Sequence, residues 1–397
     1  MGFFADVAEA PPDPIFGLMK VFQADERACK VNLTVGLFKN EQLQTPIMQV
    51  VKKAETEALQ QEKSKEYFPI EGGREFLSAV GPLVFGEPFW RDHAGRIAGC
   101  QSVGGTGGLR LGGEFLQQEA SQVVAISQPT WPNHGNIFLH CRMHLEQYPY
   151  YDEQRQNLAF DQMLDAVSKL QPGTIVLLHA SCHNPTGADL SLEQWRALSE
   201  LLKTKRLIPF FDFAYQGFGK GIEEDAQAVR LFASEGHEML VCVSFSKNFS
   251  LYGERTGALF VVTGSAKEAE NVTSQLRVLV RALYSNPSIH GAKIVTRVLT
   301  STTLRKEWES ELTAMRERID EMRKAFVQAL MDKKSKVDFR FLLDRRGMFC
   351  FTGLRSEQVD RLMNELAIYM TSDGRINVTG LNWDNLNYVV DGIIRVL

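Results

Sequence analysis

Three apolar runs in the middle of the chain end in polar residues whose types suit catalysis. Ligands of an open parallel sheet bind beyond the carboxyl ends of its strands, so the residues that close such runs are the first candidates for a site. An acid and a lysine in these places are costly to desolvate unless a ligand or a counter-charge pairs with them. The candidates are Asp212 after residues 207–211, Ser244-Phe245-Ser246-Lys247 after residues 239–243, and His179 after residues 174–178, with His183-Asn184-Pro185-Thr186-Gly187 behind it.

Lys247 has the most specific chemistry among these residues. Desolvation and nearby cations lower the pKa of a lysine at the mouth of a buried strand, and only the neutral amine forms a Schiff base with a carbonyl. A single lysine in such a place more commonly extends its ammonium to solvent. Its neighbours therefore decide between a nucleophile and a surface lysine.

A glycine-rich segment, Gly104-Gly105-Thr106-Gly107-Gly108, precedes residues 109–120, whose spacing is helical. The free amides and the dipole of a helix N-terminus favour phosphate. A plain tight turn is an equally good interpretation of the glycines. Arg110 interrupts the glycine pattern of a dinucleotide site, and the chain has no G-x-x-x-x-G-K-[ST] phosphate loop.

Metal and thiol chemistry have little support in the sequence. His179, Cys182 and His183 lack a second close pair of ligands, so we expect no metal. Cys182 lies beside His183, but no oxyanion loop or third partner accompanies the pair. The six cysteines are spread out without a C-x-x-C pair, which predicts reduced thiols in a cytoplasmic compartment.

The composition limits the class of protein. The 397 residues carry 44 Lys plus Arg and 48 Asp plus Glu, a net charge of −4, and 44% of them are hydrophobic, which is typical of a soluble globular protein. The mild acidity, without a dense basic block, argues against nucleic acid or an anionic membrane as the main partner. Residues 1–10 resemble neither a secretory signal nor a transit peptide, and no apolar run is long enough to span a membrane.

Short apolar runs alternate with stretches of helical period, which predicts βαβ units and a mostly parallel sheet. No internal repeat or long linker is visible. Proline suits the first position of a helix, so further helix starts are expected at Asp13-Pro14 and Thr45-Pro46. The expected strands are 123–127, 174–180, 207–214, 239–246 and 258–263, and the expected helices are 109–120, 160–170, 191–205 and 301–332.

The strongest motifs, in chain order, are Trp131-Pro132-Asn133-His134, Cys182-His183-Asn184-Pro185-Thr186-Gly187, Asp212-Phe213-Ala214-Tyr215-Gln216-Gly217-Phe218 and Ser244-Phe245-Ser246-Lys247-Asn248-Phe249. With them the chain resembles the class I aminotransferases, specifically the aspartate aminotransferase group and its aromatic-aminotransferase relatives. The resemblance implies pyridoxal 5′-phosphate as the cofactor and a fold-type I α/β architecture, in which a mainly parallel seven-stranded sheet forms the large domain. The expected divisions are an N-terminal arm (1–11), a large cofactor-binding domain (46–314) and a smaller α+β domain made from residues 12–45 and 315–397.

The resemblance implies catalytic roles for three residues. Lys247 resembles the Schiff-base lysine, which also moves a proton between the substrate Cα and C4′ of the cofactor. Asp212 would pair with the pyridinium nitrogen and keep it protonated, so that the ring accepts electrons. Tyr215, together with Asn184, would hydrogen-bond the phenolic oxygen of the ring.

Other positions resemble the residues that hold the cofactor. Trp131 matches the indole that stacks on the ring, and His134 matches the histidine that supports Asp212 from behind. Each of them taken singly could equally be an ordinary packing or surface residue, but together they favour a cofactor site. The matches to the phosphate-binding positions are Gly105, Thr106, Ser244, Arg255 and Tyr67.

Two arginines are expected to bind the carboxylates of the substrate, because a guanidinium forms a bidentate, charge-assisted pair with a carboxylate. Arg375 resembles the arginine for the α-carboxylate, and Arg281 resembles the one for the distal carboxylate. In the family the counterparts of Arg281 and Tyr67 come from the neighbouring subunit, so a homodimer with shared active sites is expected. The other substrate-binding matches are Gly36, in a segment over the substrate carboxylate, Trp131 and Asn184.

The implied reaction is that of a transaminase (EC 2.6.1), in which L-aspartate and 2-oxoglutarate give oxaloacetate and L-glutamate through an internal aldimine and a pyridoxamine phosphate intermediate. Two alternatives stay open: an aromatic or broad-range aminotransferase acting on tyrosine or phenylalanine, and a non-catalytic relative, which would ordinarily lack Lys247. The departures from the family pattern are Gly104, Phe38, Phe68-Pro69 and Asp373, whose carboxylate would either compete for the Arg375 guanidinium or face solvent.

Overall fold

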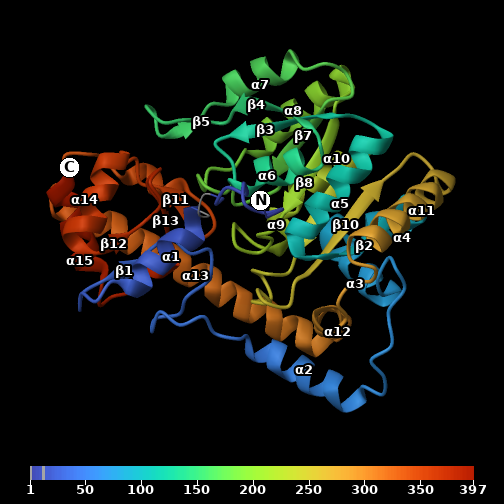
Figure 1. Cartoon of the computed structure of the whole chain (residues 1–397), viewed down its shortest axis with the longest axis horizontal. Helices are drawn as coiled ribbons and strands as arrows, with labels where there is room; N and C mark the ends of the chain where they lie inside the picture. Colours follow the sequence, from blue (N-terminus) through green and yellow to red (C-terminus); the bar gives the residue numbers. More distant parts are fainter. Residues whose placement is uncertain (1, 11–13) are drawn as a thin grey trace.

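A seven-stranded sheet forms the centre of the computed structural model, which describes residues 2–10 and 14–397 (Figure 1). In spatial order its strands are β2 (Ile97–Val103), β10 (Thr256–Val262), β9 (Met239–Ser244), β8 (Ile208–Phe213), β7 (Ile175–His179), β3 (Val123–Gln128) and β4 (His144–Pro149). Every neighbouring pair is parallel except the two pairs that β10 forms. The prediction of a mainly parallel seven-stranded α/β sheet is confirmed.

Five strands coincide with the apolar runs of the sequence, and two strands are missing from the prediction. The missing strands, β2 and β4, are not continuously apolar. Strand β4 is an edge strand whose side chains are mostly exposed, whereas Gly99, Gln101 and Ser102 interrupt the apolar pattern of β2. Gln101 donates from Nε2 to the carbonyl of Ser288 (2.6 Å), a long-range bond that sequence periodicity does not reveal.

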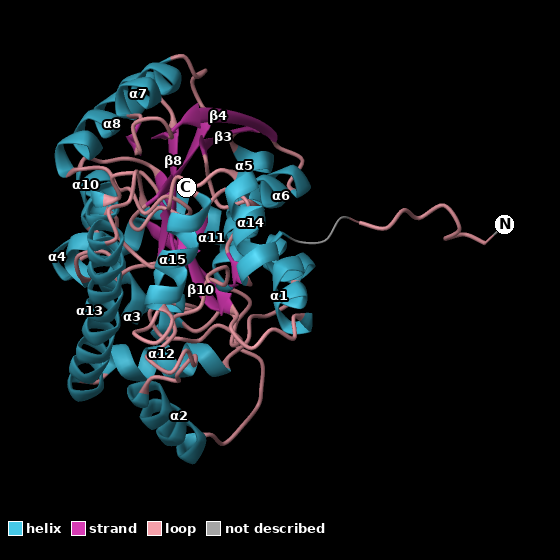
Figure 2. Cartoon of the chain, turned by 90° about the vertical axis from the view of Figure 1, so that its left-hand side faces the viewer, coloured by secondary structure: helices cyan, strands magenta, loops and turns pink. Residues whose placement is uncertain are grey.

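Helices cover both faces of the sheet (Figures 1 and 2). They are α1 Pro14–Ala24, α2 Gln49–Gln61, α3 Arg74–Phe85, α4 Glu87–His93, α5 Gly104–Glu119, α6 Asn133–His140, α7 Phe160–Ser168, α8 Leu192–Lys205, α9 Ile222–Asp225, α10 Gln227–Ser234, α11 Ala266–Leu283, α12 His290–Thr300, α13 Thr302–Asp332, α14 Ser356–Leu366 and α15 Leu386–Val396. The alternation of side chains along each strand fills two cores. In β7, Ile175 and Leu177 pack in the core with α5, α6 and α11, while Val176 and Leu178 pack in the core with α7, α8 and α10.

Two helices begin at residues other than the expected ones. Helix α2 begins at Gln49 rather than at Pro46, because the backbone is still extended at Met48 (φ −58°, ψ 138°). Helix α5 begins at Gly104, so the glycine-rich segment forms the first turns of the helix and not a loop before it. Asp13, which belongs to another expected start, lies outside the described residues.

A second group of elements packs beside the sheet and has a core of its own. It contains the two-stranded sheets β1 (Val31–Asn32) with β12 (Ile368–Tyr369) and β11 (Phe349–Phe351) with β13 (Arg375–Asn377), together with α14 and α15. Helix α13 runs through both groups: Ile319 packs in a core of the sheet, and Met322, one turn later, packs in the second core. The remaining strands, β5 (Tyr151–Asp152) and β6 (Asn157–Leu158), form a short hairpin.

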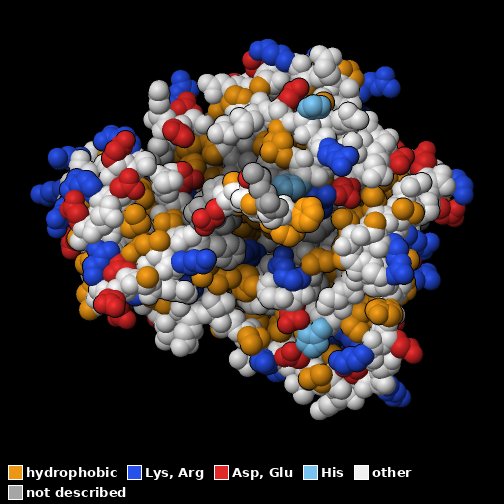
Figure 3. Space-filling view, viewed as in Figure 1, with side chains coloured by type: hydrophobic (Ala, Val, Ile, Leu, Met, Phe, Trp, Pro, Cys, Tyr) orange, Lys and Arg blue, Asp and Glu red, His pale blue; other side chains and the backbone are white. Residues whose placement is uncertain are grey.

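The surface shows three features. Residues 2–10 extend away from the rest of the chain (Figure 2). Acidic and basic side chains are interspersed over the face drawn in Figure 3. Among the described residues, no helix is long and apolar enough to cross a membrane.

Candidate active site

A cavity of ≈ 690 Å³ lies at the carboxyl ends of the parallel strands, where the second group of elements meets the sheet. Polar side chains that follow β7, β8 and β9 reach it, as the parallel topology requires. The structure therefore brings together residues from widely separated parts of the chain, from Gly36 to Arg375. The sequence-predicted residues that line the cavity are Gly36, Gly105, Thr106, Trp131, Asn184, Asp212, Tyr215, Ser244, Lys247, Arg255 and Arg375.

Asp212 is held from behind by a chain of hydrogen bonds. Its Oδ2 lies 3.0 Å from Nε2 of the buried His134, and Nδ1 of His134 lies 2.8 Å from the hydroxyl of Thr130. The same hydroxyl lies 3.1 Å from Nε2 of His179. The register of β7 and β8, which pairs His179 with Asp212, brings the two ends of this chain together. The arrangement fixes the carboxylate of Asp212 at the wall of the cavity.

His179 is a neutral member of this chain. Burial, followed by the charge of His134, lowers the pKa of His179 from its ordinary 6.5 to about 3. Burial also holds the pKa of the neighbouring His183 well below its usual value. The ring of His183 stacks on Tyr150 at 3.8 Å and hydrogen-bonds Ser127 (3.0 Å) and Thr186 (2.9 Å). Both rings therefore act as uncharged supports near neutral pH.

The neutral state of His179 predicts a loss of stability in acid. Below pH 6.5 the unfolded chain binds a proton at this residue and the folded chain does not, so the free energy of unfolding falls as the pH falls toward 3. His179→Asn should remove about 1.4 kcal/mol per pH unit from this slope. Denaturant unfolding at pH 7, 6 and 5 measures it. Between pH 7 and 9 the variant and the parent should show the same pH dependence, and an unchanged slope below pH 6.5 would contradict the neutral imidazole.

Lys247 points into the cavity. Its Nζ donates to the carbonyl of Gly36 (2.5 Å) and lies 4.9 Å from the ring centre of Tyr252. Burial, and then the charges of Arg255 and Arg375, lower its pKa from 10.5 to about 8. About one amine in ten is therefore neutral at pH 7, compared with roughly one in 3,000 at the ordinary pKa. An amine with this pKa has the chemistry required of a nucleophile toward a carbonyl and of a base.

One end of the cavity fits a phosphate group. The amides of Gly105 and Thr106 belong to the first turn of α5, and the guanidinium of Arg255 makes no ion pair with an acid among the described residues. Two hydroxyls complete this end: Ser244 donates to Ser246 (3.1 Å), and Nη1 of Arg255 donates to Ser246 (3.3 Å). A helix N-terminus, an unpaired arginine and two hydroxyls are the donors that bind a dianion.

Gly104 explains one departure from the family pattern. Its φ is +64°, and a Cβ at this position would lie 2.6 Å from Nη2 of Arg255. The backbone here is a conformation that glycine adopts without strain. The glycine therefore leaves room for the guanidinium of Arg255 beside the start of α5.

The middle of the cavity fits a ring with polar substituents. Trp131 supplies an indole to the lining, which also contains Asp212 near the end of β8 and Tyr215 in the loop after it. Burial, and then the charge of Asp212, raise the pKa of Tyr215, so its phenol keeps its proton and remains a hydrogen-bond donor. The carbonyl oxygen of Asn184 accepts from Arg375 (3.3 Å), which leaves its amide NH₂ as a donor into the cavity. An acid, two donors and an indole match the ring of pyridoxal phosphate.

Arg375 is a buried cation without a carboxylate partner among the described residues. Its Nη2 donates to the carbonyl of Thr34 (2.8 Å), its guanidinium lies 4.4 Å from the ring centre of Phe349, and its Nε has no partner. Burial lowers its pKa, yet an arginine stays charged in proteins. Donors therefore remain for an incoming carboxylate.

The carboxylate of Asp373 does not compete for this guanidinium. It is exposed, and its Oδ1 accepts the backbone N–H of Arg375 (3.1 Å) and the hydroxyl of Thr371 (2.5 Å). Of the two expectations for Asp373, exposure to solvent is the one that holds. The carboxylate also fixes the turn that leads into β13.

Three sequence-predicted residues do not line the cavity: His134, which lies behind Asp212, and Tyr67 and Arg281, which are exposed on the surface. Tyr67 is 88% exposed. Arg281, in the last turn of α11, is exposed and donates to the hydroxyl of Ser285. Neither belongs to the lining of the cavity in a single chain.

Several lining residues have no role in the sequence-based prediction. Ser246 is quoted in a motif, but its hydrogen bond from Nη1 of Arg255 (3.3 Å) is not visible in the sequence. Tyr252 accepts the backbone N–H of Phe38 with its hydroxyl (2.8 Å), and this contact joins two segments far apart in sequence. Phe349 enters from β11, which no apolar run predicts. Only the folded chain brings these residues to the site.

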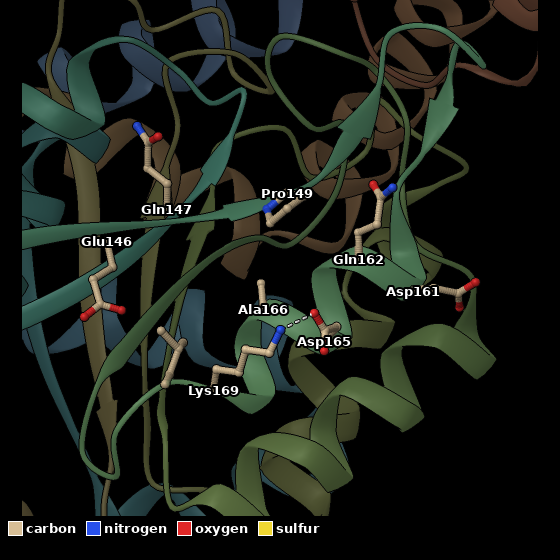
Figure 4. A pocket seen from close by; sticks show the side chains of 9 residues that line it. Glu146, Gln147, Pro149, Asp161, Gln162, Asp165, Ala166 and Lys169 are labelled. Atoms are coloured by element: carbon tan, nitrogen blue, oxygen red, sulfur yellow. Dashed lines mark hydrogen bonds and ion pairs between the residues drawn. The ribbon is translucent and has the colours of Figure 1, made fainter.

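A second hollow lies between β4 and α7 (Figure 4). It is lined mainly by exposed residues of β4 and α7, and the ammonium of Lys169 is already paired with Asp165 (2.6 Å). None of the sequence-predicted site residues reaches it. The chemistry is therefore concentrated in the cavity at the strand ends.

The fold is that of an α/β protein, and its cavity holds a lysine, an acid and the start of a helix at the strand ends of a mainly parallel sheet. Similarity to known proteins identifies the family. Residues 28–393 match the family "Aminotransferase class I and II". The aspartate aminotransferase of Haemophilus influenzae is 45% identical over 99% of this chain and 100% of its own length. That of Pseudomonas aeruginosa is 46% identical over the full length of both chains. This chain belongs to the class I and II aminotransferases.

Solved structures agree with this assignment. An aromatic-amino-acid aminotransferase from Burkholderia pseudomallei, covalently bound to pyridoxal phosphate, superposes with a TM-score of 0.97 at 46% identity and covers 100% of both chains. The cytoplasmic aspartate aminotransferase of Saccharomyces cerevisiae superposes with a TM-score of 0.95 at 33% identity, over 99% of this chain and 98% of its own. The chain therefore has the fold-type I architecture of the aminotransferases.

Proposed function

We propose that this protein catalyses the reversible transfer of an amino group from L-aspartate to 2-oxoglutarate, giving oxaloacetate and L-glutamate, with pyridoxal 5′-phosphate as its cofactor. The observation that carries the proposal is the position of Lys247. Its amine lies in the cavity with Arg255 and Arg375, whose charges both lower its pKa. A phosphate at Arg255 and an α-carboxylate at Arg375 place an aldehyde and an amino acid within reach of one amine.

The residues of the chain divide the work around the ring. Pyridoxal phosphate supplies an aldehyde and a ring that accepts electrons. Asp212, oriented by His134, holds a proton at the ring nitrogen, while Tyr215 and Asn184 donate to the ring oxygen. Lys247 accepts and returns the proton at the substrate Cα, because a pKa of about 8 suits both steps near neutral pH.

We further propose that the active site is shared within a homodimer. Arg375 binds the α-carboxylate, and Arg281 of the neighbouring subunit binds the distal carboxylate, with Tyr67 of that subunit reaching the phosphate. The exposure of Arg281 and Tyr67 in one chain, away from its own cavity, supports this arrangement. A residue that serves a partner's site has to face outward in the isolated chain.

A second candidate is an aromatic or broad-range aminotransferase. The structure of the aromatic enzyme from Burkholderia pseudomallei, at 46% identity, favours it as much as the curated relatives favour aspartate. The unpaired guanidinium of Arg375 suits the α-carboxylate of either substrate class. The two candidates differ at the distal group, which Arg281 is proposed to bind.

Two measurements test the proposal. The purified protein mixed with pyridoxal phosphate should develop a visible absorption band that aspartate changes and 2-oxoglutarate restores. The values of kcat/KM for aspartate, tyrosine and phenylalanine then separate the two candidates, since discrimination is a ratio of these constants. A strong preference for the aromatic amino acids would overturn the aspartate proposal, and a protein that never develops the band would overturn both.

Two further proposals concern organisation and compartment. We propose a large domain of residues 46–314 and a small domain of residues 12–45 and 315–397, and the separate core around β1, β12 and α15 supports this division. We propose the cytoplasm as the compartment, because the six cysteines are free thiols and five of them are buried as ordinary core residues.

A further inference from the structure

Two loops carry the donors to the proposed ring oxygen, and each is fastened to a carboxylate outside the cavity, the half-buried Asp189 or the buried Asp225. Asn184 lies in the loop after β7, and Tyr215 lies in the loop after β8. The carboxylate of Asp189 accepts the backbone N–H groups of Cys182 (2.7 Å) and His183 (2.8 Å), immediately before Asn184. Neither Asp189 nor the second carboxylate, Asp225, lines the cavity.

Asp225, in α9, fastens the second loop with three bonds. It accepts the backbone N–H groups of Gly217 (2.8 Å), Gly219 (2.8 Å) and Lys220 (2.8 Å), immediately after Tyr215. The side chain is only 6% exposed. A Cβ on Gly219 would lie 2.4 Å from Oδ1 of Asp225, so the loop closes tightly on the carboxylate.

The hydrogen bonds of the two carboxylates come from peptide N–H groups, and among the described residues neither carboxylate makes a direct ion pair with a lysine or an arginine. The charges of Arg346 and Lys220 act on Asp189 from farther away and oppose the effect of burial on its pKa. Burial raises the pKa of both groups, and the charge of Asp189 adds to the rise at Asp225. A carboxylate that accepts several peptide N–H groups fixes the geometry of those groups, because each of its bonds has to be kept once water is excluded.

The two loops also touch each other. The thiol of Cys182 lies 4.0 Å from the carbonyl oxygen of Tyr215, and the charges of Asp189 and Asp225 both raise the pKa of that thiol. Both carboxylates therefore lie close enough to this contact between the loops for their charges to act on it.

We propose that Asp189 and Asp225 are positioning residues that aim Asn184 and Tyr215 at the ring oxygen of the cofactor, an inference that rests on the proposed function. They touch neither substrate nor cofactor. They act through Asn184 and Tyr215, whose hydrogen bonds would stabilise the ionised ring oxygen. Stabilising this oxygen lowers the pKa of the nitrogen that joins Lys247 to the cofactor.

The test compares Asp189→Asn and Asp225→Asn with Asp152→Asn. Asp152 is the matched control, because it also accepts two backbone N–H groups, of Gln154 (2.9 Å) and Arg155 (3.0 Å), but in the β5–β6 hairpin outside the cavity. The readout is the pH midpoint of the visible absorption of the cofactor-loaded protein. We expect both site variants to raise this midpoint by up to about one pH unit, in the same direction as Tyr215→Phe, and the control to leave it unchanged.

Hydrogen exchange in the cofactor-free protein provides a second readout. The amides of residues 182–187 and 214–220 should exchange faster in the two site variants than in the control. If Asp225→Asn does not fold, Gly219→Ala displaces the same carboxylate without changing its charge. We expect this variant to raise the absorption midpoint and to speed amide exchange in the same way. The exchange measurement needs no bound pyridoxal phosphate. It therefore tests the role of the two carboxylates even if the proposed function is wrong.

The inference is overturned by a specific pattern. Variants whose absorption midpoint stays within about 0.2 pH units of the parent, while their melting temperature falls, would show that the carboxylates only support the fold. Unchanged amide exchange in both loops would overturn it as well.

Discussion

Lys247→Ala should abolish transamination, with kcat lower by about 10⁴-fold or more. Burial and two neighbouring cations lower the pKa of this amine to about 8, and no second lysine is found among the described residues that line the cavity, so we expect no neighbouring side chain to replace it as nucleophile and base. Stopped-flow or steady-state assays with aspartate and 2-oxoglutarate measure the loss. Borohydride reduction followed by peptide mass spectrometry should find the cofactor attached to Lys247 in the parent and no attachment in the variant.

Two controls separate the chemistry of Lys247 from its charge. Lys247→Arg keeps a cation in the cavity but cannot become neutral, so it should be as inactive as the alanine variant. Lys39→Ala removes another half-buried lysine whose pKa burial lowers, and it should retain most of the activity. An alanine variant at 247 that keeps more than about one hundredth of the parent activity would exclude the assigned role.

Arg281→Leu should discriminate between the two classes of substrate. Two charge-assisted hydrogen bonds to a distal carboxylate are each worth about 1.5–3 kcal/mol, so kcat/KM for aspartate and glutamate should fall by about 10²–10⁴-fold. For phenylalanine and tyrosine, which have no distal carboxylate, the fall should be less than about tenfold. Equal losses for both classes would contradict the assignment. Arg277→Leu, one turn earlier on α11 and paired with Glu71 on the surface, is the matched control.

A mixture of two inactive variants tests whether Arg281 acts across subunits. In a hybrid of Lys247→Ala and Arg281→Leu chains, one site contains both changes and the other contains neither. Random reassociation of equal amounts should therefore restore about a quarter of the parent activity toward aspartate. A mixture that stays inactive, although mass spectrometry detects the hybrid, would place Arg281 in the site of its own chain.

The sequence predicts the parts of this fold that are locally simple. The buried central strands β7, β8 and β9 are continuous apolar runs, and the start of α8 at Ser191 is a capping box with Gln194 (3.2 and 2.8 Å). Strand β4 is not predicted, because an edge strand with exposed side chains lacks that pattern. The start of α5 is misjudged, because glycines within a helix look like a loop until the close packing around them is known.

Some residues of the candidate site can likewise be predicted from the sequence, and others cannot. Residues next to strand ends, such as Asp212 and Lys247, can be selected from the sequence because burial of a charged group is unusual there. The supports cannot be selected in this way: Thr130, Tyr252 and Phe349 are ordinary residues whose roles depend on contacts across long distances in the chain. The two fastening carboxylates are of the same kind, since an aspartate in a loop has no distinctive pattern.

Helix α13 has a mechanical consequence. Its 31 residues span about 46 Å without a break, and near its first third Trp308 donates to the carbonyl of Asn248, next to the reactive lysine (2.7 Å). Farther along, Arg318 holds the carbonyls of Asn40 (3.0 Å) and Leu381 (3.0 Å). One continuous helix thus joins the segment beside Lys247 to the segments of Asn40 and Leu381, so any change in the tilt of this helix has to be shared by both sets of contacts.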